Sequence, residues 1–234
     1  MSWQMITSDA EVAELLSRSM DSSAVMVDTE FMRRNTFYPQ VALLQLCFDD
    51  GTLEGQAILI DPLELRDVAP LQAMLTRPGL VKVLHSASED LEVFQRWLGE
   101  CPEPLFDTQR AAALLNLGFG LGYAALVKLI CDVELPKGET RSDWLQRPLT
   151  QSQCDYAAQD VTWLLSVWRE LQARCREQGK LDWVLSDGVD TVSAARSSGV
   201  NGYHRRIKNA WKLDPRQLNA LAAVCEWRET TARI

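Results

Sequence analysis

The chain has 234 residues, 47% of them hydrophobic, and a formal net charge of −8 at pH 7. This length and apolar content suffice for one substantial core, and no apolar run approaches the ~20 residues that cross a bilayer. The first 25 residues contain no basic segment leading into an apolar one, which argues against a signal peptide. Six cysteines without a CxxC pair argue against a zinc knuckle and a disulfide framework. We therefore expect a globular cytoplasmic protein with reduced cysteines and no membrane partner.

Charge is distributed unevenly along the chain. From Arg196 to Arg216 there are six basic residues and one acidic residue, a local charge of +5 that leaves −13 for the remainder. A net negative charge argues against a nucleic-acid partner, because nucleic-acid binders usually present a basic surface. The basic stretch is compatible with either a solvated linker or a nucleic-acid contact.

Strand and helix patterns mix in the N-terminal part of the chain. The predicted elements, in order, are a helix at 7–18, strands at 24–31, 41–48 and 56–62, a helix at 71–77, a strand at 81–85 and a helix at 88–99. Ser8 and Glu11 form a capping-box pattern at the first helix, and Pro78 ends the second. Short polar or Gly-containing segments join the first three strands, which indicates a meander of neighbouring strands.

Helical patterns dominate the C-terminal part. Helices are predicted at 109–118, 123–133 and 150–179, the last ending at Gly179, and a further helix starts at Asp214. The pattern breaks in between, so we expect a domain boundary near residues 200–212. The predicted fold class is α/β, with a mixed central sheet flanked by helices and a C-terminal helical extension.

Acidic residues stand beside apolar elements at three places. The run "VMVDTEF" ends in Asp28 and Glu30, which point the same way because strand side chains alternate. Asp90 lies in the first turn of a helix, and Asp160 follows Tyr156 by one helical turn. Convergent carboxylates without histidine or cysteine suit Mg²⁺ or Mn²⁺. Two such ions ~3.5–4 Å apart stabilise the attacking and leaving oxygens in phosphodiester cleavage, and a tyrosine can position or help to deprotonate the water.

Each of these features has an ordinary alternative. A DxE at a strand end can be a solvated turn, Asp90 can simply favour the helix dipole, and Tyr156 can be a core residue. Their joint occurrence in order favours a site. The stretches "VDTEF", "VLHSASEDLEVF" and "YAAQDVTWLL" resemble the three motifs of the DEDD superfamily of 3′ to 5′ exonucleases, tyrosine subclass. "LPKGETRSDWLQRPLT" extends this resemblance to bacterial ribonuclease D, and "NAWKLDPRQLNALAAVCEWRETTAR" is similar to the start of an HRDC domain.

The resemblance implies an RNase H-like exonuclease domain over residues 1–205 and the start of a helical HRDC domain over 206–234. It implies an exoribonuclease that releases 5′-mononucleotides from RNA 3′ ends, acting on tRNA precursors and other small structured RNAs. Two divalent metal ions, Mg²⁺ or Mn²⁺, would be the cofactors, and we expect a monomer. By match of motif, Asp28, Glu30 and Asp160 would bind the first ion, Asp28 would bridge to the second, and Asp90 would reach it through water. Tyr156 would orient the attacking water.

Further candidates for substrate contact lie near the motifs. Phe31 and Met32 are predicted to wedge against the terminal base or to pack in the core. His85 is predicted to touch the 3′-terminal nucleotide or to be structural, and Gln45 to face the same groove. The polar loop before the last motif supplies candidates that either neutralise phosphates or are merely solvated. These loop residues are Lys137, Arg141 and Ser142.

Alternative functions remain open at this level. Carboxylates and metals do not recognise the 2′-hydroxyl, so a 3′ to 5′ DNA exonuclease is compatible with the same motifs. A non-catalytic nucleic-acid-binding module of this fold is a second alternative, although all four acids are present. A DxD-type phosphatase is a third, but the second acid is Glu30 and Tyr156 would be idle.

Overall fold

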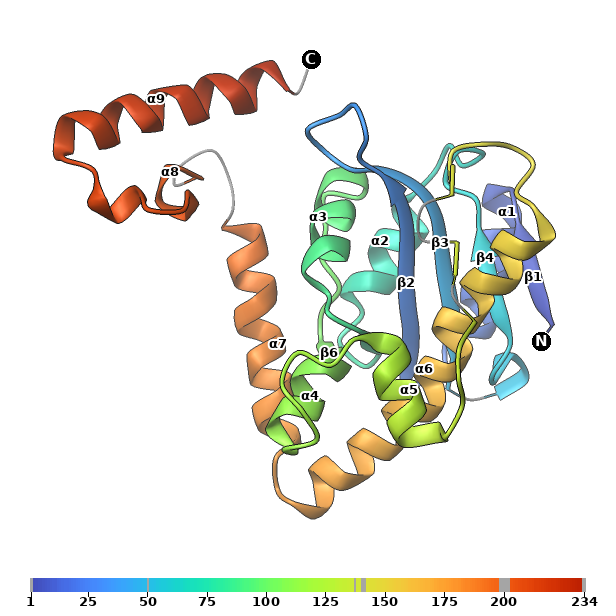
Figure 1. Ribbon diagram of the computed structural model, residues 1–234. Helices are drawn as coiled ribbons and strands as arrows, with labels where there is room; N and C mark the ends of the chain where they lie inside the picture. The colour runs from blue at the N-terminus through green and yellow to red at the C-terminus, as the bar shows by residue number, and fades with distance from the viewer. Residues whose placement is uncertain (1, 50, 137, 140–141, 198–202, 233–234) are drawn as a thin grey trace.

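The computed structural model describes residues 2–49, 51–136, 138–139, 142–197 and 203–232 (Figure 1). Six strands form one sheet in the order β1-β4-β3-β2-β5-β6. The strands are β1 (Trp3–Ile6), β2 (Ala24–Met32), β3 (Gln40–Phe48), β4 (Ala57–Ile60), β5 (Val81–Leu84) and β6 (Leu105–Asp107). The helices are α1 (Asp9–Arg18), α2 (Ala69–Thr76), α3 (Ser88–Trp97), α4 (Thr108–Leu114), α5 (Tyr123–Cys131), α6 (Gln151–Glu177), α7 (Leu181–Arg196), α8 (Tyr203–Arg206) and α9 (Pro215–Thr231). Short 3₁₀ turns lie at Gly51–Leu53 and Ala210–Lys212.

The sheet is mixed, as predicted. The pairs β2–β3 and β3–β4 are antiparallel and form the expected meander. The pairs β1–β4, β2–β5 and β5–β6 are parallel. The sequence patterns did not predict β1 and β6, which are short and contain only one β-branched residue between them, Ile6.

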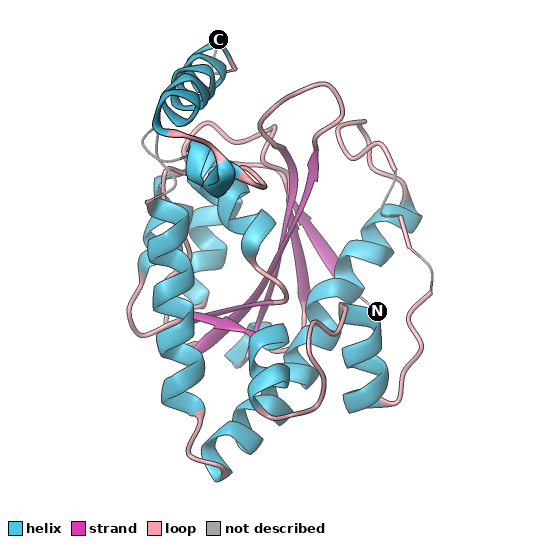
Figure 2. Cartoon of the chain, turned by 60° about the vertical axis from the view of Figure 1, so that its left-hand side comes forward, coloured by secondary structure: helices cyan, strands magenta, loops and turns pink. Residues whose placement is uncertain are grey.

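Helices cover both faces of the sheet, which Figure 2 shows edge-on between them. On one face, Val25, Val27 and Leu46 pack with buried residues of α1, α2 and α3. On the other, Met26 and Val83 pack with buried residues of α4, α5 and α6. The α/β fold with a mixed central sheet flanked by helices is therefore confirmed.

Helix α6 crosses the sheet and sets the geometry of the acidic residues. Its N-terminus is a capping box, in which the side chains of Thr150 and Gln153 each accept a hydrogen bond from the other residue's backbone N–H. Gly179, with φ +64, follows its end, as predicted. The helix packs against β2, β3 and β4. Residues one and two turns along α6 therefore lie above the central strands.

Helix α7 was not predicted from the sequence. It buries only Val184, Gly188 and Val192, a narrow stripe with a spacing of four. A Cβ added at Gly188 would lie 2.2 Å from the carbonyl oxygen of Leu105 in β6, so only glycine allows this close approach. The spacing of four between these three small or branched residues was the one feature of the sequence that indicated a helix here.

Helix α9 packs back onto the loop that joins β2 to β3. Glu229 of α9 is fully buried and accepts a hydrogen bond from the hydroxyl of Tyr38. The guanidinium of Arg228 lies 4.4 Å from the ring centroid of Phe37, and that of Arg96 lies 3.5 Å from the ring of Tyr38. Figure 1 shows α9 beside this loop. The domain boundary stays a prediction.

All six cysteines are free, and five of them are buried. Within the described residues, no helix combines the length and apolar character needed to cross a membrane.

Candidate active site

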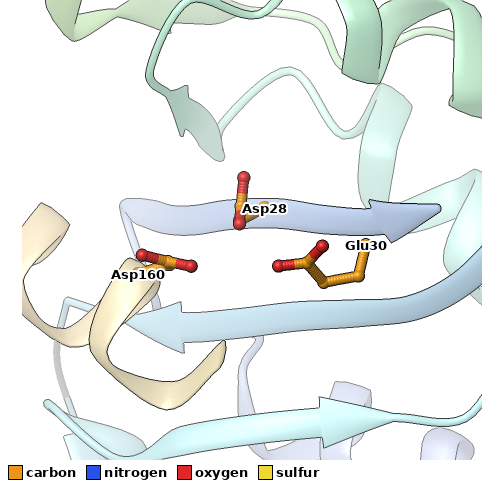
Figure 3. A group of neighbouring side chains, drawn as sticks. All are labelled: Asp28, Glu30 and Asp160. Carbon is orange, nitrogen blue, oxygen red and sulfur yellow. The ribbon is translucent and has the colours of Figure 1, made fainter. Parts of the chain in front are cut away.

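Three carboxylates from two elements converge on one face of the sheet. Asp28 and Glu30 lie on β2, and Asp160 projects from α6 across the strand (Figure 3). One carboxylate oxygen from each residue can be chosen so that all three lie within 4.8 Å of one another. The period of the strand aligns the first two side chains, and the packing of α6 brings the third.

Asp90 approaches the same strand from the opposite side. It lies in the first turn of α3, is 8% exposed, and accepts a hydrogen bond of 2.6 Å from the hydroxyl of Thr29. Thr29 stands between Asp28 and Glu30, so its side chain points to the other face. Asp90 is close enough for its charge to raise the pKa of Asp28, although it does not belong to the group of three.

Ionisation of these four acidic side chains is unfavourable when no cation is bound. Burial, and then the charges of Asp90, Asp160 and Glu30, raise the pKa of Asp28 well above its usual range. Burial and the neighbouring acids raise the pKa of Glu30 to about 9. Burial likewise raises the pKa values of Asp90 and Asp160 to about 7. The donor set consists of oxygens only, so it fits a hard divalent cation, which would relieve this repulsion.

Tyr156 stands one turn before Asp160 on the same face of α6, with its phenol beside the carboxylate. Its ring centroid lies 6.1 Å from that of Trp144, with 44° between the planes. A Cβ added at Gly138 would lie 1.8 Å from the Tyr156 ring, so the loop before α6 contacts this ring at a glycine. Burial and the negative charge of Asp160 raise the pKa of Tyr156, and the phenol is therefore neutral near pH 7.

Tyr123, at the start of α5, also supports the site and was not predicted from the sequence. Its hydroxyl lies 2.7 Å from the carbonyl oxygen of Asp160 and 3.0 Å from that of Gln159. Its ring centroid lies 5.6 Å from that of His85. A tyrosine 37 residues before its partner gives no local signal, since the contact depends on how α5 packs against α6.

Arg147 is a second structural residue that the sequence patterns did not predict. It forms an ion pair with Asp61, in which Nη2 and Oδ1 lie 2.7 Å apart. Its Nη2 also donates a hydrogen bond of 2.6 Å to the carbonyl oxygen of Ala42. Ala42 is the extra residue of β3 where the register with β2 shifts after Glu30. Arg147 therefore fastens the loop before α6 to the bulge in β3, next to the acidic strand β2.

The residues predicted to contact substrate lie in different environments. Met32 packs, partly buried, in a cluster with Trp144 and Tyr156, whereas Phe31 is half-buried on the other side of the strand. Ser142 donates to Glu139, which also accepts from Ser152 at 2.6 Å. Lys137 and Arg141 lie outside the described residues.

His85 and Gln45 are held inside the fold. Nδ1 of His85 lies 2.9 Å from the hydroxyl of Thr108, while its Nε2 is buried and has no hydrogen-bond partner among the described residues. Burial lowers the pKa of His85, so its ring is neutral near pH 7. Gln45 is fully buried and has no exposed surface to offer a substrate. The expectation that Gln45 faces an open groove is therefore not met in this structure.

A cleft of about 450 Å³ opens beside Tyr156 and is lined by Gly138, Ser152 and Asp155 among others. A larger cleft of about 800 Å³ lies between α3 and α7 and includes none of the four acids. Neither lining includes any of the four acids, and the smaller cleft adjoins them only through Tyr156.

Known proteins are similar to this chain in sequence and in fold. The sequence matches the family described as "3′-5′ exonuclease" over residues 3–176. It is 47% identical to ribonuclease D of Pseudomonas paraeruginosa over 232 residues, which cover 99% of this chain and 60% of the relative. It is also 43% identical to ribonuclease D of Escherichia coli, of which it covers 61%. The chain therefore spans about 60% of the length of these curated relatives.

Solved structures show the same similarity to ribonuclease D. The crystal structure of Escherichia coli RNase D, described as an exoribonuclease involved in structured RNA processing, matches with a TM-score of 0.88 and 41% identity. The match covers 100% of this chain and 61% of that one. Trypanosoma brucei RNase D matches with a TM-score of 0.75 over 83% of this chain and 73% of that one, but at 18% identity this likeness indicates the fold alone.

Proposed function

The chain belongs to the 3′-5′ exonuclease family, and on this premise we propose that it is a 3′ to 5′ exoribonuclease that uses two divalent metal ions and releases 5′-mononucleotides. The observation that carries the proposal is the convergence of Asp28, Glu30 and Asp160 within 4.8 Å, with Tyr156 one helical turn from Asp160 on the same face of α6. Two-metal cleavage of a phosphodiester uses such an oxygen-only cluster, whereas a phosphatase built on Asp28 alone would leave Asp160 and Tyr156 without a role.

The acidic residues would hold the ions, Mg²⁺ or Mn²⁺. Asp28, Glu30 and Asp160 would bind the first, Asp28 would also bind the second, and Asp90 would reach the second through water. When bound, the ions would supply Lewis acidity for the attacking water and the leaving oxygen. Thr29 holds the Asp90 carboxylate in a fixed orientation, since its hydroxyl donates to it at 2.6 Å.

Tyr156 would orient the attacking water. Its raised pKa keeps the phenol protonated near pH 7, so it can hold a water by hydrogen bonding but cannot serve as a base. Tyr123 would keep the backbone of α6 in place at Asp160 through its hydroxyl.

The proposed substrates are RNA 3′ ends, in tRNA precursors and other small structured RNAs. Similarity to the Escherichia coli exoribonuclease over the whole of this chain supports RNA. A 3′ to 5′ DNA exonuclease is the second candidate, because the carboxylates do not contact the 2′-hydroxyl. His85, Phe31 and Met32 remain proposed contacts of the terminal nucleotide, and Ser142 a proposed phosphate contact together with its two loop neighbours Lys137 and Arg141.

Three further proposals depend on sequence alone. They are a monomeric state, a cytoplasmic location, and a division into an exonuclease domain at 1–205 and the beginning of an HRDC domain at 206–234. Gel filtration with light scattering would test the first.

A degradation assay tests the proposed activity. Matched RNA and DNA oligonucleotides, each labelled at the 3′ end or at the 5′ end, are incubated with Mg²⁺, Mn²⁺ or chelator. We expect metal-dependent release of labelled mononucleotide from the 3′ end of RNA, and loss of at least 10³-fold in rate for Asp28→Asn because a metal ligand is removed. Asp132→Asn is the matched control, since Asp132 is an exposed carboxylate at the end of α5. Equal rates for Asp28→Asn and Asp132→Asn would refute the assignment, and faster loss of DNA than of RNA would favour the second candidate.

A further inference from the structure

Gln45 is a buried residue whose amide nitrogen and oxygen form no hydrogen bond in the described structure. It is 0% exposed, and within the described structure neither its Nε2 nor its Oε1 has a hydrogen-bond partner. A buried amide without partners costs free energy that an apolar residue of similar size would not. A residue retained only for packing would be apolar here, as its neighbours are.

The neighbours of Gln45 in the sheet identify the polar group closest to it. Leu43 and Cys47 flank it on the same face of β3, and Leu59 is its partner on β4; all three are fully buried. Its partner on β2 is Asp28. Residues directly opposite each other in antiparallel strands share a face, with Cβ atoms about 5 Å apart. Among its partners in the register, Asp28 alone can accept a hydrogen bond from the amide.

Helix α6 closes the space above Gln45. Ala157 packs with Leu43 and Leu59, so the turn of α6 that leads to Asp160 lies over this part of β3. Tyr156, one turn before Asp160, packs against the same cluster. The amide is therefore enclosed between apolar side chains and the floor of the carboxylate cluster.

We propose that Gln45 is a positioning residue of the metal site, whose amide N–H donates to the Asp28 carboxylate when that carboxylate is ionised and bound to metal. An ionised carboxylate has about four lone-pair positions and no donor, so one that binds two ions still accepts from an amide. Hydrogen bonds to metal-binding carboxylates orient them, and loss of such a bond typically costs 10–100-fold in metal affinity. This inference rests on the proposed metal site, and it gives Gln45 a role that needs no contact with substrate.

The test compares two buried glutamines. Gln45→Met keeps the unbranched shape and removes both polar atoms. Gln153→Met is the matched control, because Gln153 is 1% exposed but fully bonded: its Oε1 accepts from the Thr150 N–H at 2.9 Å, and its Nε2 donates to the Asp143 carbonyl at 3.1 Å. Mn²⁺ binding is measured by titration calorimetry after removal of metals, and thermal unfolding is measured in EDTA.

We expect opposite outcomes for the two variants. Gln45→Met should weaken Mn²⁺ binding by about tenfold or more and leave the melting temperature in EDTA unchanged or a few degrees higher, because an unsatisfied amide has been removed. Gln153→Met should lower the melting temperature and leave the Mn²⁺ affinity unchanged.

Three results would overturn the inference. One is a wild-type Mn²⁺ affinity in Gln45→Met, which would leave Gln45 a packing or water-binding residue. Another is an equal loss of affinity in both variants, since the effect would then follow from general instability. If the unsubstituted chain itself gives no Mn²⁺ binding, the proposed metal site fails and this inference fails with it, whereas the first two results leave the metal site intact.

Discussion

Glu30 is a carboxyl group that should destabilise the metal-free protein at neutral pH. Burial, and then the charges of Asp160 and Asp90, raise its pKa from 4.5 to about 9. Between these values the folded chain holds a proton that the unfolded chain has released, so the stability of the metal-free protein falls as the pH rises through this window. Below about pH 4.5 the group is protonated in both states, and the penalty vanishes.

The structure sets the size of the effect. Each pKa unit corresponds to ~1.4 kcal/mol, so at pH 7.5 the full shift would cost up to ~4 kcal/mol. Glu30 is only partly buried, and solvent reduces the penalty, so we expect about 2 kcal/mol. Coulomb repulsion alone is of this order, because two unit charges at the 4.8 Å limit of the cluster repel by ~3.5 kcal/mol at an effective dielectric constant of ~20.

The variant Glu30→Gln removes this charge and keeps the shape of the side chain. In EDTA, its free energy of unfolding should exceed that of the wild-type chain by about 2 kcal/mol at pH 8 and by little at pH 5. In saturating Mg²⁺ the wild-type chain should instead be the more stable of the two. A metal ion that binds only the folded state stabilises the protein with the intact site more than it stabilises Glu30→Gln. Urea unfolding followed by tryptophan fluorescence measures these differences, with Glu14→Gln, an exposed position on α1, as the control. The reasoning is refuted if Glu30→Gln is no more stable than the wild-type chain in EDTA at pH 8, or if the difference does not depend on pH.

Three further substitutions test other parts of the site and the core. Tyr156→Phe should slow RNA degradation by about 10²-fold while calorimetric Mn²⁺ affinity stays near the wild-type value; an unchanged rate would assign the phenol to packing. Tyr123→Phe should lower the free energy of unfolding by ~1 kcal/mol and reduce the exonuclease rate several-fold, since the backbone of Asp160 loses a donor; unchanged urea unfolding would contradict this. Lys82 is fully buried on β5 and donates to the carbonyl oxygens of Leu80 at 2.6 Å and Arg77 at 2.9 Å. Burial, and then the charge of Arg77, lower the pKa of Lys82 from 10.5 to about 7. Between these values the unfolded chain holds the extra proton, so relative to Lys82→Met the wild-type chain should gain ~1 kcal/mol of stability per pH unit from pH 7.5 to 9.5; a difference that is flat over this range would exclude the shift.

Local periodicity predicted which acidic and aromatic side chains share a face, and the resemblance to known motifs then implied that they form a site. A strand period of two aligns Asp28 with Glu30, and one helical turn places Tyr156 beside Asp160. The meander of β2, β3 and β4 followed from short connections. These relations involve neighbours along the chain, and backbone geometry determines them wherever the element lies.

Tertiary structure decided which of these components meet. The packing of α6 across the sheet brings Asp160 to β2, and the register of β2 with β3 sets Gln45 opposite Asp28. The Arg147 ion pair with Asp61 joins residues 86 positions apart. Such contacts depend on how elements pack and on strand register, to which no single local pattern corresponds. The sequence of this chain therefore determined its acidic motifs and the elements that carry them, whereas only the fold decided that they form one cluster, because long-range packing sets the distances between them.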